Sequence, residues 1–395
     1  MIPSIARYDF NIPTHTVFGC GSLSKLHEQK LPGRKALVVI SCGKSTRANG
    51  YLDRTIAELE HAGVQVSVFD KVQPNPLKDT VMEGAEAARD CEADFIVALG
   101  GGSVMDAAKA MAMMATNPGD LWDYVMFGTG GRKPAENAPL PLVAITTTAG
   151  TGSETDSGGV ITNPDTHEKT AVFDGHRLMP VLAIVDPELM VSVPPAFTAY
   201  QGFDALFHST EGYMSKTANY MSDLVALGAI ENIGRYLPVA VNDGKNMEAR
   251  EHVAYANWLS GLQMEFNGCT SEHSLEHALS AYHQELPHGA GLIMISMAYY
   301  RHFVQAGCCP ERFVRMAKAL GKADAACAED FLTALADVLK ACGVDELKMS
   351  DYGITPDEFP AMADNAVSAM GFLFANDPAP LSREDCIKIY TESYR

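Results

Sequence analysis

Two short segments of the chain carry side chains that suit a transition-metal ion. Asp204 and His208 are four residues apart, so on a helix they project from one face. The segment 271–289 holds four of the 12 histidines, namely His273, His277, His283 and His288. Imidazoles with a carboxylate suit zinc or ferrous iron, whereas magnesium and calcium prefer oxygen ligands alone. Spacing alone would make His273 and His277 the obvious ligand pair.

A simpler interpretation of both segments needs no metal. Asp204 and His208 would form a local helical contact, and the histidines of residues 271–289 would lie on a solvated face. Either segment taken in isolation favours that interpretation. Both, however, lie in otherwise apolar helices, and the turn at residues 286–291 places His288 at the boundary of an element. Taken together, the two segments predict a metal site.

A glycine-rich junction is the second feature that suits chemistry. Residues 94–109 read as a buried strand, a turn at Gly100, Gly101 and Gly102, and then a helix. Such a junction directs unpaired helix amides at an anion, and glycines let a phosphate approach the backbone. A pyrophosphate fits here, with Ser103 and Asp106 close by. The alternative is a tight turn whose glycines are required for positive φ, because the pattern is not the usual G-x-G-x-x-G.

A second loop of small residues follows the next strand. Residues 144–155 run from that strand into a stretch of threonines, glycines and serine. Two such loops at the carboxyl ends of parallel strands fit a nucleotide-binding crevice, whereas one loop would not.

The elements that position these residues change character along the chain. Short β-branched runs alternate with helical stretches up to about Pro187, which predicts a parallel sheet covered on both faces. The predicted strands are residues 36–40, 64–69, 95–99, 142–145 and 182–185, and the predicted helices between them include 52–62 and 81–90. Beyond the proline-rich segment at Pro194 the windows are helical, and they include residues 199–213, 222–236, 247–265, 271–282 and 310–319. We therefore expect an α/β domain at residues 1–193 and an all-α domain at 194–395.

Composition narrows the class of protein. A chain of 395 residues with a formal net charge of −19 repels polyanions on average, so no nucleic-acid partner is expected. The N-terminus lacks the pattern of a signal peptide, and no apolar run approaches the roughly 20 residues of a membrane helix. The nine cysteines are scattered without a C-x-x-C pair, which favours free thiols in the cytoplasm.

Four ordered motifs now define a resemblance. They are G-G-G-S-x-x-D-x-A-K at 100–109, T-T-x-A-G-T-G-S-E at 146–154, G-x-D-A-L-x-H-x-x-E at 202–211, and H-x-x-x-H with P-H-G at 273–289. In this order they resemble the iron-containing (group III) alcohol dehydrogenase family. The match spans nearly the whole chain, including the turn at residues 17–21 and the segment at 74–76.

The resemblance implies a dinucleotide-binding domain, a helical domain and one divalent metal in the cleft between them. By position, the metal ligands would be Asp204, His208, His273 and His288, which leaves His277 free for proton relay near the nicotinamide. Contacts to NAD or NADP would fall on Asn75, Gly101, Gly102, Ser103, Asp106, Thr147, Thr148, Thr151 and Lys169. The metal would be Fe²⁺ or, as an alternative, Zn²⁺, and a homodimer or larger homo-oligomer is expected.

Two positions depart from the family pattern. Many NAD-specific relatives have an aspartate where this chain has Ser41, and a hydroxyl with Lys44 nearby would also admit NADPH. Glu276 stands where relatives usually have a small residue, and we expect it to carry charge into the substrate entrance.

The resulting hypothesis is a metal-dependent oxidoreductase that moves a hydride between NAD(P)H and a short-chain aldehyde or alcohol. The metal would stabilise charge on the substrate oxygen. One alternative is a glycerol- or diol-type polyol dehydrogenase of the same superfamily. Another is a non-catalytic nucleotide- and metal-binding assembly protein, which would need neither the complete nucleotide loops nor all four ligands.

Overall fold

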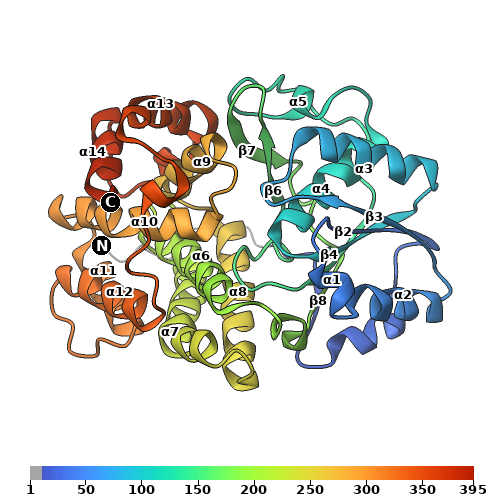
Figure 1. The fold of residues 1–395 in the computed structure, drawn as a ribbon, viewed down its shortest axis with the longest axis horizontal. Coiled ribbons are helices and arrows are strands. Elements are labelled where there is room, and N and C mark those ends of the chain that lie inside the picture. The colour runs from blue at the N-terminus through green and yellow to red at the C-terminus, as the bar shows by residue number, and fades with distance from the viewer. Residues whose placement is uncertain (1–10) are drawn as a thin grey trace. The chain divides into compact units, whose positions relative to one another are not determined.

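The structure, a computed structural model, describes residues 11–395 and divides into two compact units (Figure 1). The α/β unit comprises residues 11–148 and 152–192, and the helical unit comprises residues 149–151 and 193–395. The chain passes from one unit to the other at Ser192 and Val193, beside the proline-rich segment. The short segment 149–151 groups with the helical unit although it lies inside the α/β sequence.

A parallel sheet forms the centre of the α/β unit, as the sequence predicted, but it has six strands rather than the five expected. Its strand order is β1-β8-β5-β4-β2-β3. The central strands β4 and β5 are buried along their whole length, as expected for a sheet covered on both faces. The strands are β1 (His15–Phe18), β2 (Lys35–Ser41), β3 (Gln65–Val72), β4 (Phe95–Gly100), β5 (Leu142–Thr146) and β8 (Leu182–Val185).

Helices cover both faces of this sheet, and each face has its own hydrophobic core (Figure 1). On one face the strands pack against α3 (Lys78–Asp90), α4 (Gly102–Thr116) and α5 (Leu121–Tyr124). On the other face they pack against η1 (Ser22–Glu28) and α2 (Tyr51–His61), which follows the short α1 (Ser45–Ala48). Because side chains alternate along a strand, Leu37 and Val39 enter the first core while Val38 and Ile40 enter the second.

The sequence did not predict a two-stranded antiparallel hairpin in this unit. It consists of β6 (Gly158–Asn163) and β7 (Glu168–Phe173), paired from Gly158 with Phe173 to Asn163 with Glu168. Two glycines open the first strand and charged residues open the second, so neither shows the apolar run of the main sheet. The hairpin is held to the chain near α3 by a hydrogen bond from the Thr162 amide to the Pro76 carbonyl (2.8 Å).

The remainder of the chain is helical, again as predicted, and the predicted bounds of α9 and α11 match the structure. A short 3-10 helix, η2 (Pro187–Met190), precedes it. The helices are α6 (Pro195–Met214), α7 (Tyr220–Asn242), α8 (Met247–Asn267), α9 (Ser271–Tyr282), α10 (His288–Gln305), α11 (Pro310–Ala319), α12 (Glu329–Ala341), α13 (Phe359–Met370) and α14 (Arg383–Ser393), with 3-10 turns η3 (Met349–Tyr352), η4 (Pro356–Glu358) and η5 (Leu373–Asn376).

Helix α7 is an exception to the expectation that no apolar run approaches the length of a membrane helix. It is 23 residues long with a mean hydropathy of 1.3, enough by those measures to cross a membrane. In the structure it packs against α6 and α8. Its Asp223 forms a buried two-bond ion pair with Arg312 of α11 (2.8 and 3.0 Å), a contact typical of a protein interior.

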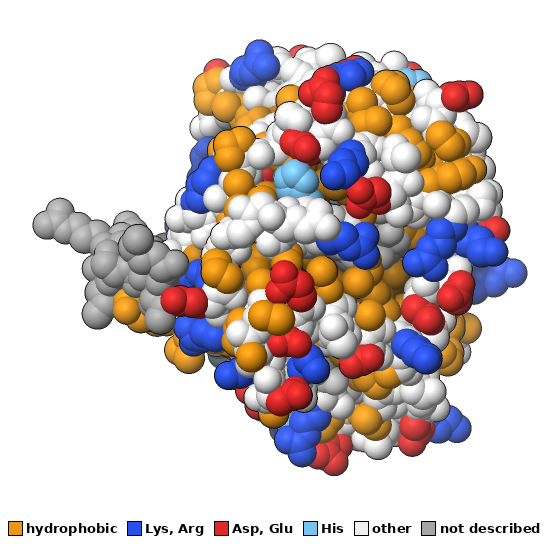
Figure 2. All heavy atoms as spheres, turned by 90° about the vertical axis from the view of Figure 1, so that its left-hand side faces the viewer, with side chains coloured by type: hydrophobic (Ala, Val, Ile, Leu, Met, Phe, Trp, Pro, Cys, Tyr) orange, Lys and Arg blue, Asp and Glu red, His pale blue; other side chains and the backbone are white. Residues whose placement is uncertain are grey.

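Close approach of helices explains two glycines of α6. A Cβ at Gly202 would lie 2.2 Å from Leu237 of α7, and one at Gly212 would lie 1.6 Å from the Gln263 amide of α8. Both glycines thus allow α6 to pack closely against α7 and α8. On the outside, the face in Figure 2 shows acidic and basic side chains interspersed among hydrophobic ones.

Candidate functional site

Helix α6 carries the first half of the predicted metal site in its buried middle. Asp204 and His208 are 4% and 5% exposed, and His208 Nδ1 lies 3.5 Å from Asp204 Oδ1. A carboxylate is costly to bury unless other charges or donors surround it. The local contact that the simpler interpretation proposed is therefore present, but it is only one edge of a larger cluster.

Helix α9 supplies the histidines of the second half, and it is buried over residues 271–281. His273 and His277 are 3% and 6% exposed, so the interpretation that they lie on a solvated face is wrong. His283 lies outside the cluster, where its Nε2 is 3.0 Å from Glu358.

His288 enters the cluster as the first residue of α10. The glycine that follows it allows this, because a Cβ at Gly289 would lie only 2.2 Å from the carbonyl oxygen of Tyr200 in α6. The P-H-G motif therefore has a packing reason: proline is the N-cap residue before the helix, histidine points into the cluster, and glycine permits close contact with α6.

One carboxylate oxygen lies at the centre of the assembled group. Asp204 Oδ1 is 3.5 Å from His208 Nδ1, 3.4 Å from His273 Nε2 and 3.5 Å from His288 Nε2. Metal–ligand bonds of about 2.1 Å in a tetrahedron give edges of about 3.4 Å between ligand atoms. The three N···O distances equal that edge, and the ligand atoms of Asp204, His273 and His288 lie within 4.8 Å of one another. These three residues therefore fit a divalent ion of zinc or iron size, with His208 beside Asp204.

The protonation of Asp204 and His208 also suits a cation. Burial lowers the pKa of His208 to about 3, which leaves the imidazole neutral and its lone pair available. Burial alone would raise the pKa of Asp204, but the neighbouring His208 and His288 hold it well below its ordinary value. An ionised carboxylate and a neutral imidazole are the ligating forms of these side chains.

Two glutamates orient the histidines, a role that sequence reasoning assigned to neither of them. Glu211 of α6 hydrogen-bonds Nδ1 of His273, and Glu276 of α9 hydrogen-bonds Nδ1 of His288. Such carboxylate partners fix ring orientation and tautomer in metal sites. A signal was available, because Glu211 and Glu276 each follow a site histidine by three residues on the same helix.

The expectation that Glu276 carries charge into the substrate entrance was consequently wrong. Its side chain is fully buried and bonded to His288 rather than directed into a substrate entrance. Gly291 makes room for it, since a Cβ there would lie 2.8 Å from the Glu276 side chain.

His277 lies beside the cluster rather than at its centre. Its ring centroid is 5.3 Å from that of His288 and 6.2 Å from that of His273. With Glu276 and His288 it forms a second group of close donor atoms. The structure thus brings His277 next to two of the four candidate ligands, His273 and His288.

In the α/β unit, the glycine turn between β4 and α4 does not depend on positive φ. Gly100, Gly101 and Gly102 all have φ outside that region, so the alternative explanation of the triplet is wrong. Space is the reason instead: a Cβ at Gly100 would lie 2.6 Å from Val104, and one at Gly101 would lie 2.7 Å from Thr148. This contact places the start of α4 directly against the Thr147–Thr148 loop.

Asp106, near the start of α4, holds the next loop. Its carboxylate accepts bonds from the Ser153 hydroxyl (2.8 Å) and the Val160 amide (2.9 Å). Lys109, one turn later, donates to Ser153, to Asp156 and to the Gly158 carbonyl. The D-x-A-K part of the motif therefore ties the hairpin of β6 and β7 to the glycine turn.

The other predicted nucleotide contacts lie at several separate places in the chain. Lys169 donates to the side chain of Asn75 (3.1 Å), so these two lie together. Ser103 is in the first turn of α4, and Thr151 groups with the helical unit. Ser41, at the end of β2, lines a cavity of about 440 Å³ together with Lys44, Arg47 and Asp70.

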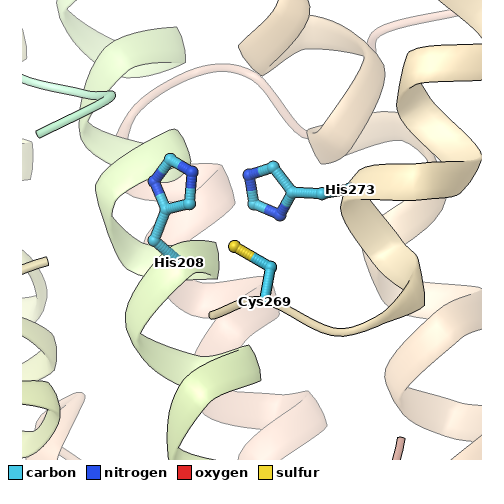
Figure 3. Close-up of side chains that lie close together, drawn as sticks. All are labelled: His208, Cys269 and His273. Atoms are coloured by element: carbon cyan, nitrogen blue, oxygen red, sulfur yellow. The ribbon is translucent and has the colours of Figure 1, made fainter. Parts of the chain in front are cut away.

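All nine cysteines are free thiols, as the sequence predicted, and one of them belongs to the metal cluster. The sulfur of Cys269 and a ring nitrogen of each of His208 and His273 lie within 4.8 Å of one another (Figure 3). No motif had indicated this cysteine.

Comparison with known proteins gives matches along the whole chain. The sequence profile described as iron-containing alcohol dehydrogenase matches residues 13–187, and that of the C-terminal part of the family matches residues 198–394. A 1,3-propanediol dehydrogenase of Klebsiella pneumoniae is 33% identical over 99% of this chain and 100% of its own length. An NAD-dependent methanol dehydrogenase of Bacillus methanolicus is 34% identical over 91% of this chain and 93% of its own.

Solved structures agree. An archaeal halo-thermophilic alcohol dehydrogenase from a Red Sea brine pool has a TM-score of 0.92 at 33% identity, covering 98% of this chain and 100% of its own. A 1,3-propanediol oxidoreductase has a TM-score of 0.88 at 33% identity with the same coverage. The predicted resemblance is thus confirmed by sequence and by fold. The chain belongs to the iron-containing alcohol dehydrogenase family.

Proposed function

We propose that this alcohol dehydrogenase holds one divalent metal ion on Asp204, His208, His273 and His288 and transfers a hydride between NAD(P)H and a short-chain aldehyde or alcohol. The observation that carries the proposal is the position of Asp204 Oδ1, 3.4–3.5 Å from a nitrogen of each of the three histidines. A metal ion bound there, Fe²⁺ or alternatively Zn²⁺, would supply positive charge to the substrate oxygen.

Side chains of the protein orient the proposed metal ligands and limit the access of water to them. Glu211 and Glu276 hold the rings of His273 and His288, so that both can present Nε2 towards Asp204. Because Asp204, His208 and His273 are buried, charge on the substrate oxygen would be stabilised mainly by fixed groups rather than by mobile solvent.

The α/β unit would bind the nicotinamide cofactor. Its amides at the start of α4 suit a pyrophosphate, and the neighbouring glycines leave space for it. The nucleotide contacts in our proposal are Gly101, Gly102, Ser103, Asp106, Thr147, Thr148, Thr151, Asn75 and Lys169. Asp106 would act by fixing the loop through Ser153 and Val160.

His277 would move the hydroxyl proton of the substrate. An imidazole has an ordinary pKa near neutrality, which suits proton transfer in either direction. It is 6% exposed and its ring centroid lies 5.3 Å from that of His288.

The end of β2 would determine which dinucleotide is accepted. Ser41 offers a hydroxyl in place of a carboxylate, and Lys44 and Arg47 add positive charge to the same cavity, although Arg47 is paired with Asp70 (2.7 Å). This arrangement suits the binding of NADPH as well as NADH. Replacing Ser41 by Asp should raise KM for NADPH about tenfold or more while leaving KM for NADH within a few-fold, because only NADPH carries a 2′-phosphate to repel.

The matched control for this substitution is Ser45→Asp, an added carboxylate outside the residues that line the cavity. Equal effects of Ser41→Asp on the two cofactors would contradict the assignment of Ser41 to the ribose site.

Diols are the second class of substrate that an observation favours. Two 1,3-propanediol dehydrogenases, from Klebsiella pneumoniae and Citrobacter freundii, are 33% and 34% identical to this chain over 99% of its length. A non-catalytic role is less well supported, because the metal cluster and the nucleotide loops are both complete. We further propose that the enzyme is a cytoplasmic homodimer or larger homo-oligomer without a membrane or nucleic-acid partner.

The deciding experiment uses the full-length protein loaded without air with Fe²⁺ or Zn²⁺. Nicotinamide absorbance is followed with NADH and NADPH separately against short aldehydes and diols, and metal content is measured by elemental analysis. We expect metal-dependent turnover that His273→Ala abolishes together with metal retention, and that His283→Ala preserves because His283 pairs with Glu358 outside the cluster. Binding of metal and nucleotide without turnover of any alcohol or aldehyde would instead support the non-catalytic role.

A further inference from the structure

Cys269 is the one candidate donor at the metal cluster that no motif or proposed role accounts for. It lies in the short connection between α8 and α9 and is 8% exposed. A buried cysteine is most often a small apolar side chain in a core. Here, however, its surroundings are not apolar, because two of the proposed metal ligands face it.

The backbone holds Cys269 firmly in this position. Gly268, which precedes it, has a φ of 67° and ends α8. The Asn376 side chain donates to the carbonyl of Cys269 (2.9 Å), and the hydroxyl of the next residue, Thr270, donates to Glu211 (3.0 Å). The segment is therefore anchored on both sides of the thiol, and its direction follows from the fold.

The sulfur points at the rings that carry the proposed ligands. Figure 3 shows His208 on α6 and His273 on α9 side by side, with the Cys269 sulfur directed towards both. The ring centroids are 4.2 Å apart, and the sulfur and one nitrogen from each ring lie within 4.8 Å of one another. With a metal–sulfur bond of about 2.3 Å and metal–nitrogen bonds of about 2.0–2.1 Å, a tetrahedral ion needs S···N edges of about 3.6 Å. Because the three donor atoms lie within 4.8 Å of one another, side-chain shifts of about 1 Å at most would meet that requirement.

We propose that Cys269 is a sulfur donor for the metal ion held by His208 and His273. The centre would then combine three imidazoles and a carboxylate with one thiolate, and it could exchange the weaker oxygen ligand for sulfur when a soft ion is bound. Thiolate ligands favour Zn²⁺ and Co²⁺ over the oxygen-preferring Mg²⁺. This inference rests on the proposed metal site and adds to it a ligand that the family motifs do not contain.

Coordination also determines the protonation state of the thiol. A divalent ion that binds the sulfur displaces its proton, which is released to solvent. The donor is then a thiolate, which is a strong ligand for a soft ion.

Cobalt absorption tests the proposal directly. The full-length chain, stripped of metal under anaerobic conditions, is titrated with Co²⁺ while visible and near-ultraviolet spectra are recorded. Visible d–d bands report any Co²⁺ in a low-symmetry protein site, whereas an intense near-ultraviolet band arises only from sulfur-to-cobalt charge transfer. We expect both in the native protein. In Cys269→Ala and Cys269→Ser the charge-transfer band should be lost while the d–d bands persist.

Cys342→Ala is the matched control, because Cys342 is also a buried thiol of the helical unit (7% exposed) but belongs to no group of donors found among residues 11–395. It should keep both kinds of band. Zn²⁺ affinity, measured by competition with a chromogenic chelator, should fall about tenfold or more in both Cys269 variants and remain unchanged in the control. Far-ultraviolet circular dichroism verifies that each variant is folded.

The outcomes separate this inference from the proposed function. Strong d–d bands without charge transfer in the native protein would show that the Asp and His site binds cobalt without sulfur, which overturns the role of Cys269 alone. Charge transfer that survives Cys269→Ser would assign the sulfur ligand to another cysteine and also overturn it. A protein that gives neither kind of band with Co²⁺ overturns both proposals.

Discussion

The glycine turn of the α/β unit and the histidine cluster of the helical unit are built in opposite ways. The turn between β4 and α4 depends on side chains that are missing, since a Cβ at Gly101 would lie 2.7 Å from Thr148. The cluster depends on polar side chains buried in helices, such as His273 at 3% exposure and Glu276 at 0%. The first region offers backbone amides and space, whereas the second offers ligand atoms held by partners.

This difference determines how each region fails. Adding a methyl group should damage the turn through a clash, with little electrostatic consequence. Changing a polar atom in the cluster leaves a buried partner without its bond, which costs more than the bond itself contributed. Variants that alter one region at a time, with metal binding and nucleotide binding measured separately, therefore test this difference.

The largest effect is expected from Glu211→Gln. The amide keeps the shape of the side chain but not the negative charge that holds Nδ1 of His273. Loss of such a partner typically weakens metal affinity by about 10–100-fold. Competition with a chelator should show this weakening for Zn²⁺ or Co²⁺, while fluorescence titration should show unchanged NADH affinity.

Glu58→Gln is the control for this change, because Glu58 also bonds Nδ1 of a histidine, His27, at 2.5 Å, but does so within the α/β unit. It should leave metal affinity unaltered. Equal metal affinity in Glu211→Gln and the native chain would show that Glu211 is not needed to orient His273.

Gly101→Ala should have the converse effect, about a tenfold rise in the Kd or KM of the nucleotide. The new Cβ would meet both Cγ2 (2.7 Å) and Oγ1 (2.8 Å) of Thr148, so the turn must open. Metal affinity should not change. Gly228→Ala in α7 is the control, since its Cβ would meet a single atom of Leu259 at 3.2 Å. If metal affinity fell as much as nucleotide affinity, the two regions would not be independent and the comparison would be wrong.

The sequence predicted most of the fold because its periodicities are local. The β-branched runs gave the five strands β2, β3, β4, β5 and β8, and the helical windows gave α9 and α11 with their bounds. The hairpin of β6 and β7 was missed because its strands lack a continuous apolar run. Its place depends on contacts with other parts of the chain, such as Asp106 with Val160, which no local pattern reveals.

For the candidate site the sequence named residues but not their partners. Asp204, His208, His273 and His288 do come together, on three helices whose mutual positions depend on glycines such as Gly289. The roles of Glu276 and Cys269 were not predicted, because burial and direction emerge only when α6, α8, α9 and α10 pack. Likewise, the reason for the glycine triplet is contact with Val104 and Thr148, and not a backbone angle.

A pH dependence of stability should arise in the polar helical unit. Asp377 is fully buried, and its Oδ1 accepts a bond from the Ser271 amide at the start of α9 (2.9 Å) and lies 3.3 Å from the Tyr299 hydroxyl. Burial raises the pKa of Asp377 to about 7 from the ordinary 3.8. The folded state therefore retains a proton that the unfolded state loses near pH 4, so the contribution of this group to stability is greatest below pH 4 and disappears as the pH rises through 7.

Asp377→Asn removes that dependence because an amide does not ionise. Between pH 5 and pH 8 the free energy of unfolding of the native chain should fall by about 2 kcal/mol relative to the variant, which corresponds to a few degrees in Tm. Urea unfolding at both pH values measures the difference. Asp364→Asn is the control: the pKa of Asp364 is lowered by its bond to Arg383, so its ionisation is complete below this range and no divergence is expected. Parallel curves for the native chain and Asp377→Asn would mean that the Asp377 carboxylate is stabilised in the fold. In that case, the free-energy cost of burying polar groups would arise in the ligand cluster and not at the start of α9.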